Sequence, residues 1–278
     1  MVDWHRVAVV MPAYNAARTL VRTLDGIPRD IADYLILVDD ASSDETPVVA
    51  ARLGLTVLRH ARNLGYGGNQ KTCYAAALQT DASVVAMLHP DYQYSPRLLG
   101  AMVWMIVSGD YDIVLGSRIL GNKARAGGMP LYKYASNRLL TAAENVLLGS
   151  KLSEFHTGYR AFRREVLETL ALLEGSNDFV FDNQILAQAV RRGYRIGEIS
   201  CPTRYLPEAS SISFLRSVVY GLGVLATAAR YRLDAWGLRR DRLFAPTGRR
   251  LTPARLAEPG LLAGRPDGLT QSTDGQPP

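Results

Sequence analysis

SVVAMLHPDYQY, residues 83–94, joins a short apolar strand to a group of side chains that can bind a metal ion. The run from 83 to 88 is typical of a strand buried on both faces of a parallel sheet. It ends at His89, Asp91 and Gln93, and open α/β sheets bind their ligands at this end of a strand. The oxygens of Asp91 and Gln93 suit Mg²⁺ or Mn²⁺ shared with a diphosphate. The alternative is structural, with Asp91 capping the helix after Pro96.

The alternation of apolar strands and helical patterns continues on both sides of this stretch. We expect strands at 7–11, 35–38, 56–59, 83–88 and 113–115, with helices at 17–25, 46–53, 68–80 and 96–108 between them. Strands separated by helices of this length indicate βαβ units and a mainly parallel sheet covered on both faces. The sequence therefore predicts a Rossmann-like, doubly wound α/β fold.

The second half of the chain is less regular. Its patterns predict helices at 132–148, 182–192 and 212–233, with a strand at 196–199. From Trp236 onward hydrophobic periodicity is lost, so residues 236–278 are expected to be largely disordered. Residues 1–235 would then form one domain with two halves, of about 1–120 and about 121–235.

Length and composition set the class of protein. The 278 residues are 47% hydrophobic and 21% charged, which is ordinary for a soluble globular protein. The net charge of +6 comes mostly from arginine, which suits phosphate but does not separate nucleotide from lipid. No apolar run approaches the roughly 20 residues that span a bilayer. Cys73 and Cys201 are isolated, which fits a cytoplasmic location. The cations are dispersed, so no nucleic-acid partner is expected.

Reactive side chains follow four of the expected strands. The loops read PAYN at 12–15, DDASSDET at 39–46, HPDYQ at 89–93 and GSR at 116–118. In a parallel sheet these ends point the same way, so the loops are expected to meet in one crevice. Each loop also has a structural explanation, as a turn or a helix cap. Their convergence favours a ligand site.

This ordered series of motifs resembles the family 2 glycosyltransferases of the GT-A fold, and among them the dolichyl- or polyprenyl-phosphate sugar transferases. The resemblance covers residues 7 to about 232. It implies an inverting transfer of a sugar from a UDP- or GDP-sugar to a polyprenyl phosphate. It also implies dependence on a divalent metal ion, Mg²⁺ or Mn²⁺.

On this resemblance, the half of about 1–120 would bind the nucleotide and the half of about 121–235 the acceptor, and several strand ends would bind the nucleotide sugar. Asp40, with Asp39 beside it, matches the acid that hydrogen-bonds the base, and Arg204 matches the arginine that neutralises the diphosphate. The complete expected donor set is Pro12, Ala13, Tyr14, Asn15, Asp39, Asp40, Gly65, His89, Pro90, Asp91, Arg118 and Arg204. Gly65 belongs to the loop RNLGYGGN, residues 62–69, which resembles a glycine-containing loop of the family.

The metal motif departs from the family. Asp91 and Gln93 keep its spacing, but His89 stands where the family has an aspartate. The expected metal ligands are Asp91, Gln93 and His89. The role of His89 stays open. The alternatives are a third metal ligand, a residue that contacts the ligands without touching the metal ion, and a contact to the nucleotide.

The acceptor side is expected in the second half. EFHTGYR, residues 154–160, resembles a family segment that lines this side of the site. The expected acceptor-binding residues are Ser136, Asn137, Arg138, Thr157, Gly158 and Arg160. The catalytic set is Asp91, Asp182 and Arg204, with Asp182 as general base if the acceptor is a hydroxyl. An acceptor phosphate is already ionised and needs no strong base.

Two departures keep alternatives open. Ser210 and Ser211 stand where related enzymes often have Ser-Lys, which removes one expected phosphate cation. The alternatives are a soluble hydroxyl acceptor or a protein that binds a nucleotide sugar without catalysis. The last helix is apolar nearly all round. It would lie at the inner face of the membrane as a peripheral contact, pack on the sheet, or meet a second subunit in a homo-oligomer.

Overall fold

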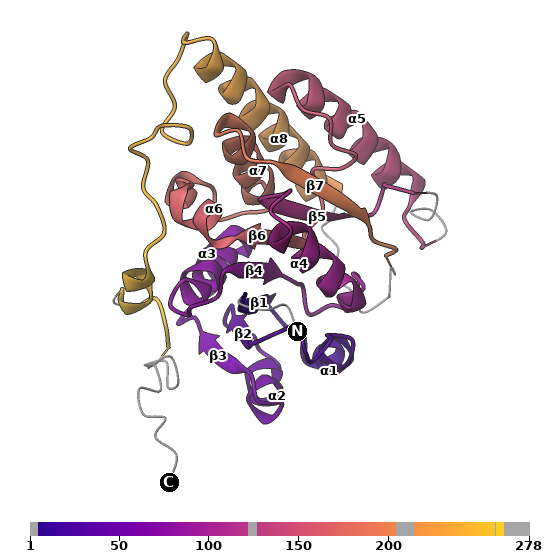
Figure 1. Ribbon diagram of the computed structural model, residues 1–278, viewed down its shortest axis with the longest axis vertical. Helices are drawn as coiled ribbons and strands as arrows, with labels where there is room; N and C mark the ends of the chain where they lie inside the picture. The colour runs from indigo at the N-terminus through magenta and orange to yellow at the C-terminus, as the bar shows by residue number, and fades with distance from the viewer. Residues whose placement is uncertain (1–4, 122–126, 204–213, 259, 264–278) are drawn as a thin grey trace.

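A seven-stranded sheet forms the centre of the computed structural model, which describes residues 5–121, 127–203, 214–258 and 260–263. Its strand order is β3-β2-β1-β4-β6-β5-β7 (Figure 1). The strands are β1 (Val7–Ala13), β2 (Tyr34–Asp39), β3 (Thr56–Arg59), β4 (Val84–Met87), β5 (Ile113–Ser117), β6 (Arg160–Arg163) and β7 (Ile196–Ser200). The pairs β3–β2, β2–β1, β1–β4 and β5–β7 are parallel, so the predicted mainly parallel sheet is confirmed.

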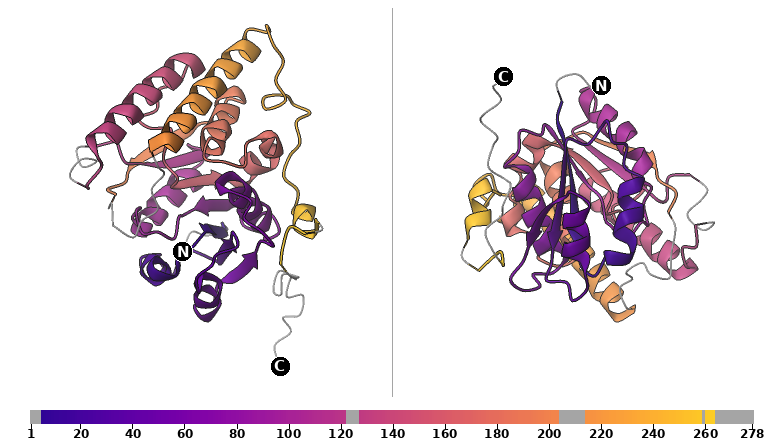
Figure 2. Two further views of the ribbon diagram at one scale, coloured as in Figure 1. Left: turned by 180° about the vertical axis from the view of Figure 1, so that it is seen from behind. Right: turned by 90° about the horizontal axis from the view of Figure 1, so that it is seen from below.

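Helices cover both faces of this sheet (Figure 2). They are α1 (Ala17–Asp25), α2 (Thr46–Arg52), α3 (Tyr66–Ala77), α4 (Leu99–Val107), α5 (Leu131–Leu148), α6 (Arg164–Thr169), α7 (Phe181–Arg191) and α8 (Phe214–Ala235), with 3₁₀ helices η1 (Pro96–Leu98), η2 (Leu172–Glu174) and η3 (Pro253–Ala257). Alternate strand residues enter opposite cores: Val10 packs with α3 and α7, whereas Val9 packs with α1 and α4. The doubly wound arrangement is therefore confirmed.

Strand β6 was missed by the sequence analysis. It runs antiparallel to both β4 and β5 and separates them in the sheet. Its four residues read Arg-Ala-Phe-Arg, with Arg160 fully buried. A strand this short shows no alternation of apolar and polar residues from which it could be predicted. Because charged side chains are seldom buried, an arginine at each end also argues against a strand inside a sheet.

Helices α5 and α8 lie side by side on the far side of the sheet from β3 (Figure 1). Helix α8 also packs against α7, so it is part of the folded domain. No helix within the described ranges is both long and apolar enough to cross a bilayer.

The end of the chain differs from its prediction. We call residues 237–258 and 260–263 the C-terminal strap. Its side chains Leu243, Phe244, Leu251, Leu256 and Leu261 are buried in the core shared with α3 and α7, so these residues are packed and not disordered. The apolar residues are widely spaced and each fills a gap between other elements, which explains the lack of periodicity. Residues 264–278 lie outside the described part of the chain.

Candidate functional site

The loops after β1, β2, β4 and β5 lie at one edge of the sheet. Because β6 is antiparallel to both neighbours, β4 and β5 keep the same direction as β1 and β2. Backbone N–H of Asn15 donates to Ser42 Oγ at 2.8 Å, and Asn15 Oδ1 accepts from Ser43 N–H at 2.9 Å. Asn15 and Ala41 have φ values of 53° and 58°, in the left-handed region, which turns both loops sharply. The expected convergence of these two loops is therefore present.

Asp39 ends β2 beneath these loops. One oxygen, Oδ2, accepts from Ser42 N–H at 3.1 Å and lies 3.3 Å from Arg59 Nε. The other oxygen, Oδ1, is buried without a hydrogen-bond partner among the described residues. Buried polar atoms are nearly always paired, so an unpaired carboxylate oxygen is a candidate acceptor for a ligand donor. Tyr14, above it on the β1 loop, is 57% exposed.

Asp40 contacts the glycine-containing loop. Its Oδ1 accepts from Leu64 N–H at 2.8 Å and lies 2.6 Å from His60 Nδ1, while Oδ2 accepts from Gly65 N–H at 3.1 Å. These contacts hold the glycine-containing loop, and the assignment of Asp40 as the base-contacting acid stays a prediction. His60 carried no sequence signal, because its role depends on a partner 20 residues away.

The glycine-containing loop passes close to the segment before α7. Gly65 has φ of 83°, and a Cβ there would meet the Asn177 carbonyl oxygen at 2.7 Å. That oxygen accepts from Gly67 N–H at 2.8 Å and from Gly68 N–H at 3.2 Å. Glycine is therefore required at residue 65 by backbone conformation and by space.

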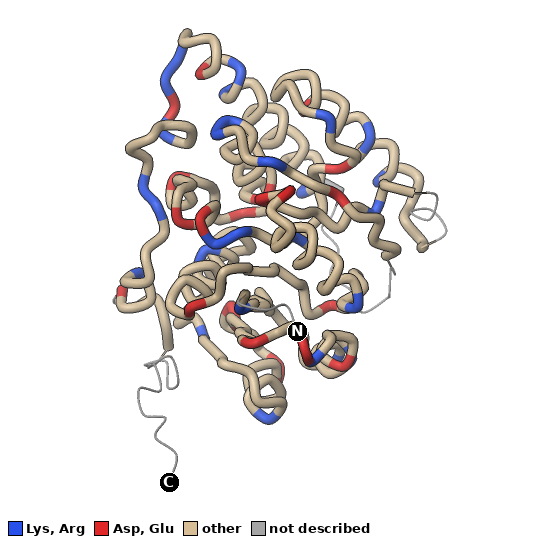
Figure 3. The backbone as a smooth tube through the Cα atoms, in the orientation of Figure 1, with Lys and Arg blue, Asp and Glu red and all other residues tan. Residues whose placement is uncertain are grey.

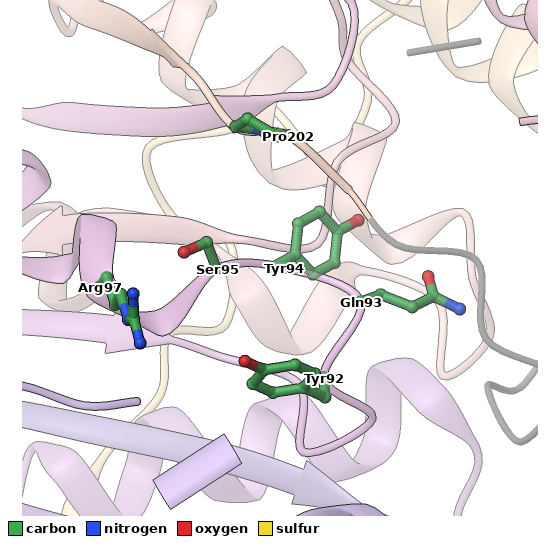
Figure 4. Close-up of a pocket in the computed structure, with 6 residues that line it drawn as sticks. All are labelled: Tyr92, Gln93, Tyr94, Ser95, Arg97 and Pro202. Carbon is green, nitrogen blue, oxygen red and sulfur yellow. The ribbon is translucent and has the colours of Figure 1, made fainter. Parts of the chain in front are cut away.

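The loop after β4 forms a tight turn. Tyr92 has φ of 57°, and Asp91 Oδ1 accepts from Gln93 N–H at 3.1 Å. A cavity of about 70 Å³ lies beside the turn, lined by Tyr92, Gln93, Tyr94, Ser95, Arg97 and Pro202 (Figure 4). Pro202 follows β7 and leads to the loop of Arg204, Ser210 and Ser211, all three outside the described residues.

The His89 ring contacts Tyr66 inside the protein. Its Nε2 lies 3.0 Å from Tyr66 Oη, and the two rings are stacked with 5° between their planes. A Cβ at Gly158 would lie 2.5 Å from the same nitrogen, so Gly158 makes room for His89. Burial lowers the pKa of His89. In the described ranges no three His, Cys, Asp or Glu side chains are grouped to hold a metal ion. The predicted set of Asp91, Gln93 and His89 includes a glutamine and stays a prediction.

Asp182 begins α7 and faces the same cluster. Its Oδ2 accepts from Tyr66 Oη at 2.8 Å, and its Oδ1 accepts from Gln70 Nε2 at 2.9 Å. Arg160 Nη1 lies 3.6 Å from Oδ1. Both oxygens are thus engaged by other side chains, which stabilises the ionised carboxylate. This environment favours a positioning role for Asp182 over that of a general base.

Arg160 bonds to other parts of the protein. Its side chain is fully buried, and the guanidinium donates to the carbonyl oxygens of Phe155 at 3.0 Å, Thr157 at 2.7 Å and Asp182 at 2.6 Å. Thr157 is also buried, and its hydroxyl donates to the Gly116 carbonyl at 2.7 Å. These bonds shape the segment 155–160 and give both side chains a structural role. Their contact with an acceptor stays a prediction.

Arg118 and Asn137 are likewise used inside the protein. Buried Glu154 accepts from Arg118 N–H at 2.7 Å, from Arg118 Nε at 2.8 Å and from Asn137 Nδ2 at 2.7 Å. Burial alone would raise the pKa of Glu154, but Arg118 holds it below its ordinary value. The contacts of Arg118 with the donor and of Asn137 with the acceptor stay predictions. Their neighbours Ser136 and Arg138 are exposed on α5.

A second buried polar cluster had no sequence signal. His156 Nδ1 lies 2.8 Å from Tyr220 Oη, and Asn183 Nδ2 donates to Glu144 Oε1 at 2.8 Å. His156 Nε2 and Glu144 Oε2 are 3.4 Å apart, and neither has a hydrogen-bond partner in the described structure. Burial raises the pKa of Glu144 to about 8 and lowers that of His156 to about 4. The cluster joins α5, α7 and α8 around the segment 155–160.

Comparison with known sequences agrees with these motifs. The family model for glycosyl transferase family 2 matches residues 8–171. The dolichyl-phosphate hexose transferase of Haloferax volcanii is 32% identical over 200 residues, covering 71% of this chain and 82% of that protein. The polyprenol monophosphomannose synthase of Mycolicibacterium smegmatis is 24% identical over 243 residues, covering 84% and 88%. Two other relatives are longer, and the chain spans 36% and 56% of their lengths.

Solved structures share the fold. A crystal structure of glucosyl-3-phosphoglycerate synthase from Mycobacterium tuberculosis contains Mn²⁺, UDP-glucose and phosphoglyceric acid. It has a TM-score of 0.62 and 21% sequence identity with this chain, covering 86% of this chain and 82% of that one. The predicted GT-A fold is confirmed by this likeness.

Proposed function

Because the chain belongs to glycosyl transferase family 2, we propose that it transfers a sugar from a UDP- or GDP-sugar to a polyprenyl phosphate, with inversion at the anomeric carbon. The names of the two relatives described above support a lipid phosphate as acceptor. The observation that carries the proposal in this chain is an exposed apolar face on α5 and α8, described below.

The donor would lie over the carboxyl edge of β1, β2 and β4. Asp39 Oδ1 provides a free acceptor for an N–H of uracil or guanine. A single carboxylate with an amide oxygen fits Mg²⁺ or Mn²⁺ shared with a diphosphate, so Asp91 and Gln93 would hold that ion. The ion would supply positive charge against the departing diphosphate. Arg204 stays a predicted second cation.

The acceptor chemistry favours a phosphate over a hydroxyl. An ionised phosphate oxygen would form a bond to the anomeric carbon while the bond from that carbon to the nucleotide diphosphate breaks. No proton has to be removed, which agrees with the engagement of Asp182 by Tyr66, Gln70 and Arg160. Asp182→Asn is therefore expected to have a mild effect on kcat.

The face that would meet the lipid is formed by exposed apolar side chains of α5 and α8. Leu139 is 73% exposed and Val146 76% on α5, while Val219 is 62% and Leu222 63% exposed on α8. The two helices pack side by side (Figure 1), and each carries two of these exposed side chains. Large exposed apolar patches mark interaction sites.

Charge on this face suits anionic lipid. Glu144 and Asp234 are the acidic residues in the sequences of α5 and α8, and both are buried. Arg138 and Arg216 are exposed, and Figure 3 shows long uncharged stretches on both helices. At the end of α8, the guanidinium of Arg232 lies 5.7 Å from the ring centre of exposed Trp236. Arginine and tryptophan are common where proteins meet membrane headgroups.

The face also connects to the site. Arg138 Nη1 donates to the Ser153 carbonyl at 3.1 Å, and Tyr220 of α8 meets His156. Both contacts reach the segment that leads to Gly158, beside His89. A lipid phosphate held at α5 and α8 would therefore be next to the predicted donor site.

Vesicle flotation combined with a transfer assay tests this function. The chain should bind anionic vesicles, and it should transfer a sugar from a UDP- or GDP-sugar to a short-chain polyprenyl phosphate with Mg²⁺ or Mn²⁺. The variant Leu139→Asp/Val219→Asp should lose flotation, whereas Val48→Asp on α2 should keep it as a matched exposed control. Absence of vesicle binding together with absence of lipid-linked product from every donor that is hydrolysed would refute the lipid acceptor.

One observation favours a soluble acceptor as the second candidate. The structural neighbour contains phosphoglyceric acid beside UDP-glucose, and the likeness covers 86% of this chain. Transfer to small phosphorylated or hydroxyl acceptors, without vesicle binding, would support this candidate. In that case Asp182→Asn should remove most of kcat, because a hydroxyl acceptor needs a base.

A further inference from the structure

The C-terminal strap crosses from the end of α8 to β3, at the opposite end of the sheet (Figure 2). It is anchored by apolar contacts: Phe244 packs edge-on against Tyr231, with ring centres 5.6 Å apart, and Leu251 and Leu256 are buried. The strap therefore holds a fixed position on the domain. Its path ends beside the nucleotide-side loops.

The last described residues of the strap extend the sheet. Ala61 N–H donates to the Leu261 carbonyl at 3.2 Å, and Ala263 N–H donates to the Arg59 carbonyl at 2.8 Å. His60 and Leu262 form an antiparallel bridge between these bonds. Since β3 is an edge strand, the strap covers hydrogen-bonding groups that would otherwise be unpaired.

Arg59 and His60, which this bridge fixes, contact the residues at the carboxyl end of β2. Arg59 lies 3.3 Å from Asp39 and donates to the Ser42 carbonyl at 3.1 Å. His60 contacts Asp40 at 2.6 Å and Thr72 Oγ1 at 2.9 Å. Through Asp40, this support continues to the amides of the glycine-containing loop.

A second connection approaches the same loop from its other side. Arg249 of the strap pairs with Glu174 at 3.0 Å, and its carbonyl accepts from Leu173 N–H at 3.1 Å. This segment continues to Asn177, whose carbonyl accepts from Gly67 and Gly68. Lys71 Nζ ties the segment to α3 by donating to the Gly175 carbonyl at 2.6 Å and to Asn177 Oδ1 at 2.7 Å.

We propose that the C-terminal strap is a positioning element that holds the loop of residues 63–68 from both sides and thereby sets the affinity for the donor nucleotide. The identity of the ligand rests on the proposed function. A loop that is already ordered loses less conformational entropy on binding, so removing its supports weakens binding without removing any contact to the ligand.

Amide hydrogen exchange on the full chain without ligand tests the loop directly. Ala263→Pro removes the N–H donor to Arg59, whereas Ala263→Gly keeps it as the matched control. The amides of Leu64 and Gly65, which bond to Asp40, should exchange about five-fold faster or more in the proline variant, the scale of one hydrogen bond. Faster exchange at Ala61 alone, with unchanged Leu64 and Gly65, would mean that the strap only covers the edge strand and would overturn the proposal.

Calorimetry with UDP and GDP in the presence of Mg²⁺ tests the consequence. The Kd of the bound nucleotide should rise by about three- to ten-fold in Ala263→Pro and stay unchanged in Ala263→Gly. An unchanged Kd in the proline variant would overturn the proposed effect on affinity. A wild-type chain that binds neither nucleotide would refute the proposed function and, with it, the proposed effect of the strap on nucleotide affinity. The hydrogen-exchange result would still decide whether the strap positions the loop.

A second variant covers the case in which Ala263→Pro fails to fold. Arg249→Gln breaks the pair with Glu174, and Arg250→Gln is its control, because Arg250 bonds within the strap to the Pro246 carbonyl at 3.1 Å. Arg249→Gln should speed exchange at Gly67 and raise the nucleotide Kd, and Arg250→Gln should do neither. Equal behaviour of the two variants would count against the strap.

Discussion

The two halves of the sheet use buried polar groups differently. At the carboxyl ends of β1 and β2, the buried acid Asp39 keeps an oxygen unpaired, and Asp40 organises a loop through backbone amides. Around β5 and β6, the charged motif residues are paired within the protein, Arg160 with backbone carbonyls and Arg118 with buried Glu154. Two atoms of this half without a hydrogen-bond partner among the described residues, Glu144 Oε2 and His156 Nε2, belong to the buried cluster between α5, α7 and α8. The first half thus leaves binding capacity for a ligand, whereas in the second half the motif residues build the scaffold.

This difference changes which residues are expected to touch substrate. On the acceptor side, exposed Ser136 and Arg138 and the apolar face of α5 and α8 remain candidates, because the buried motif residues have their partners already. Four predictions test the contrast between the halves.

The largest effect is expected at Arg160. Arg160→Met removes a buried cation from Asp182 and three carbonyl oxygens, which should lower the free energy of unfolding by about 3–5 kcal/mol. Arg138→Met, on the exposed face, should change stability by less than about 0.5 kcal/mol and raise the acceptor KM. Urea unfolding and acceptor titrations measure both. A stable Arg160→Met protein with a raised acceptor KM would return Arg160 to the substrate site.

Asp91 tests the donor half. Asp91→Ala should reduce sugar transfer by about two orders of magnitude or more, the scale for losing a group that stabilises charge in the transition state. Asp110→Ala, at an exposed acid that precedes the amino end of β5, is the control and should be near normal. Near-normal transfer by Asp91→Ala, or full wild-type activity in excess chelator, would contradict the metal assignment.

Asp39 and Asp40 separate binding from support within that half. In Asp39→Asn, one orientation of the amide places an NH₂ donor where the unpaired acceptor oxygen Oδ1 was. This variant should weaken nucleotide binding by about 1–3 kcal/mol. Asp40→Asn should mainly lower the melting temperature, because Leu64 and Gly65 donate to its carboxylate. Calorimetry and thermal unfolding distinguish the two. The reverse pattern would restore Asp40 as the base contact.

The smallest effect concerns pH. Burial raises the pKa of Glu144 from 4.5 to about 8, so Glu144 makes the free energy of unfolding fall as the pH increases between those values. The pKa of His156 falls from 6.5 to about 4, so His156 makes the free energy of unfolding rise with pH over that range. Up to pH 6.5 this rise offsets the fall caused by Glu144. Stability should therefore fall between pH 6.5 and about 8, and Glu144→Gln should flatten that fall in urea unfolding. An unchanged slope in this variant would remove Glu144 as the cause.

The sequence by itself determined the sheet and the edge at which the site lies. Strands β1, β2 and β4 are short apolar runs, and a parallel arrangement requires their carboxyl ends to meet, so the loops of Asn15, Asp39 and Asp91 could be placed together in advance. These are local patterns, which depend on neighbouring residues in the chain.

Tertiary structure alone decided what each polar side chain does. Arg160, Asn137 and Asp40 match motif positions, but their partners are carbonyls, a glutamate and amides that folding brings in from other segments. The strap is the same case, because its spaced apolar residues have no period and acquire a place only when gaps between helices exist to receive them. A buried polar group takes whichever partner lies within hydrogen-bond distance, and that distance is set by packing.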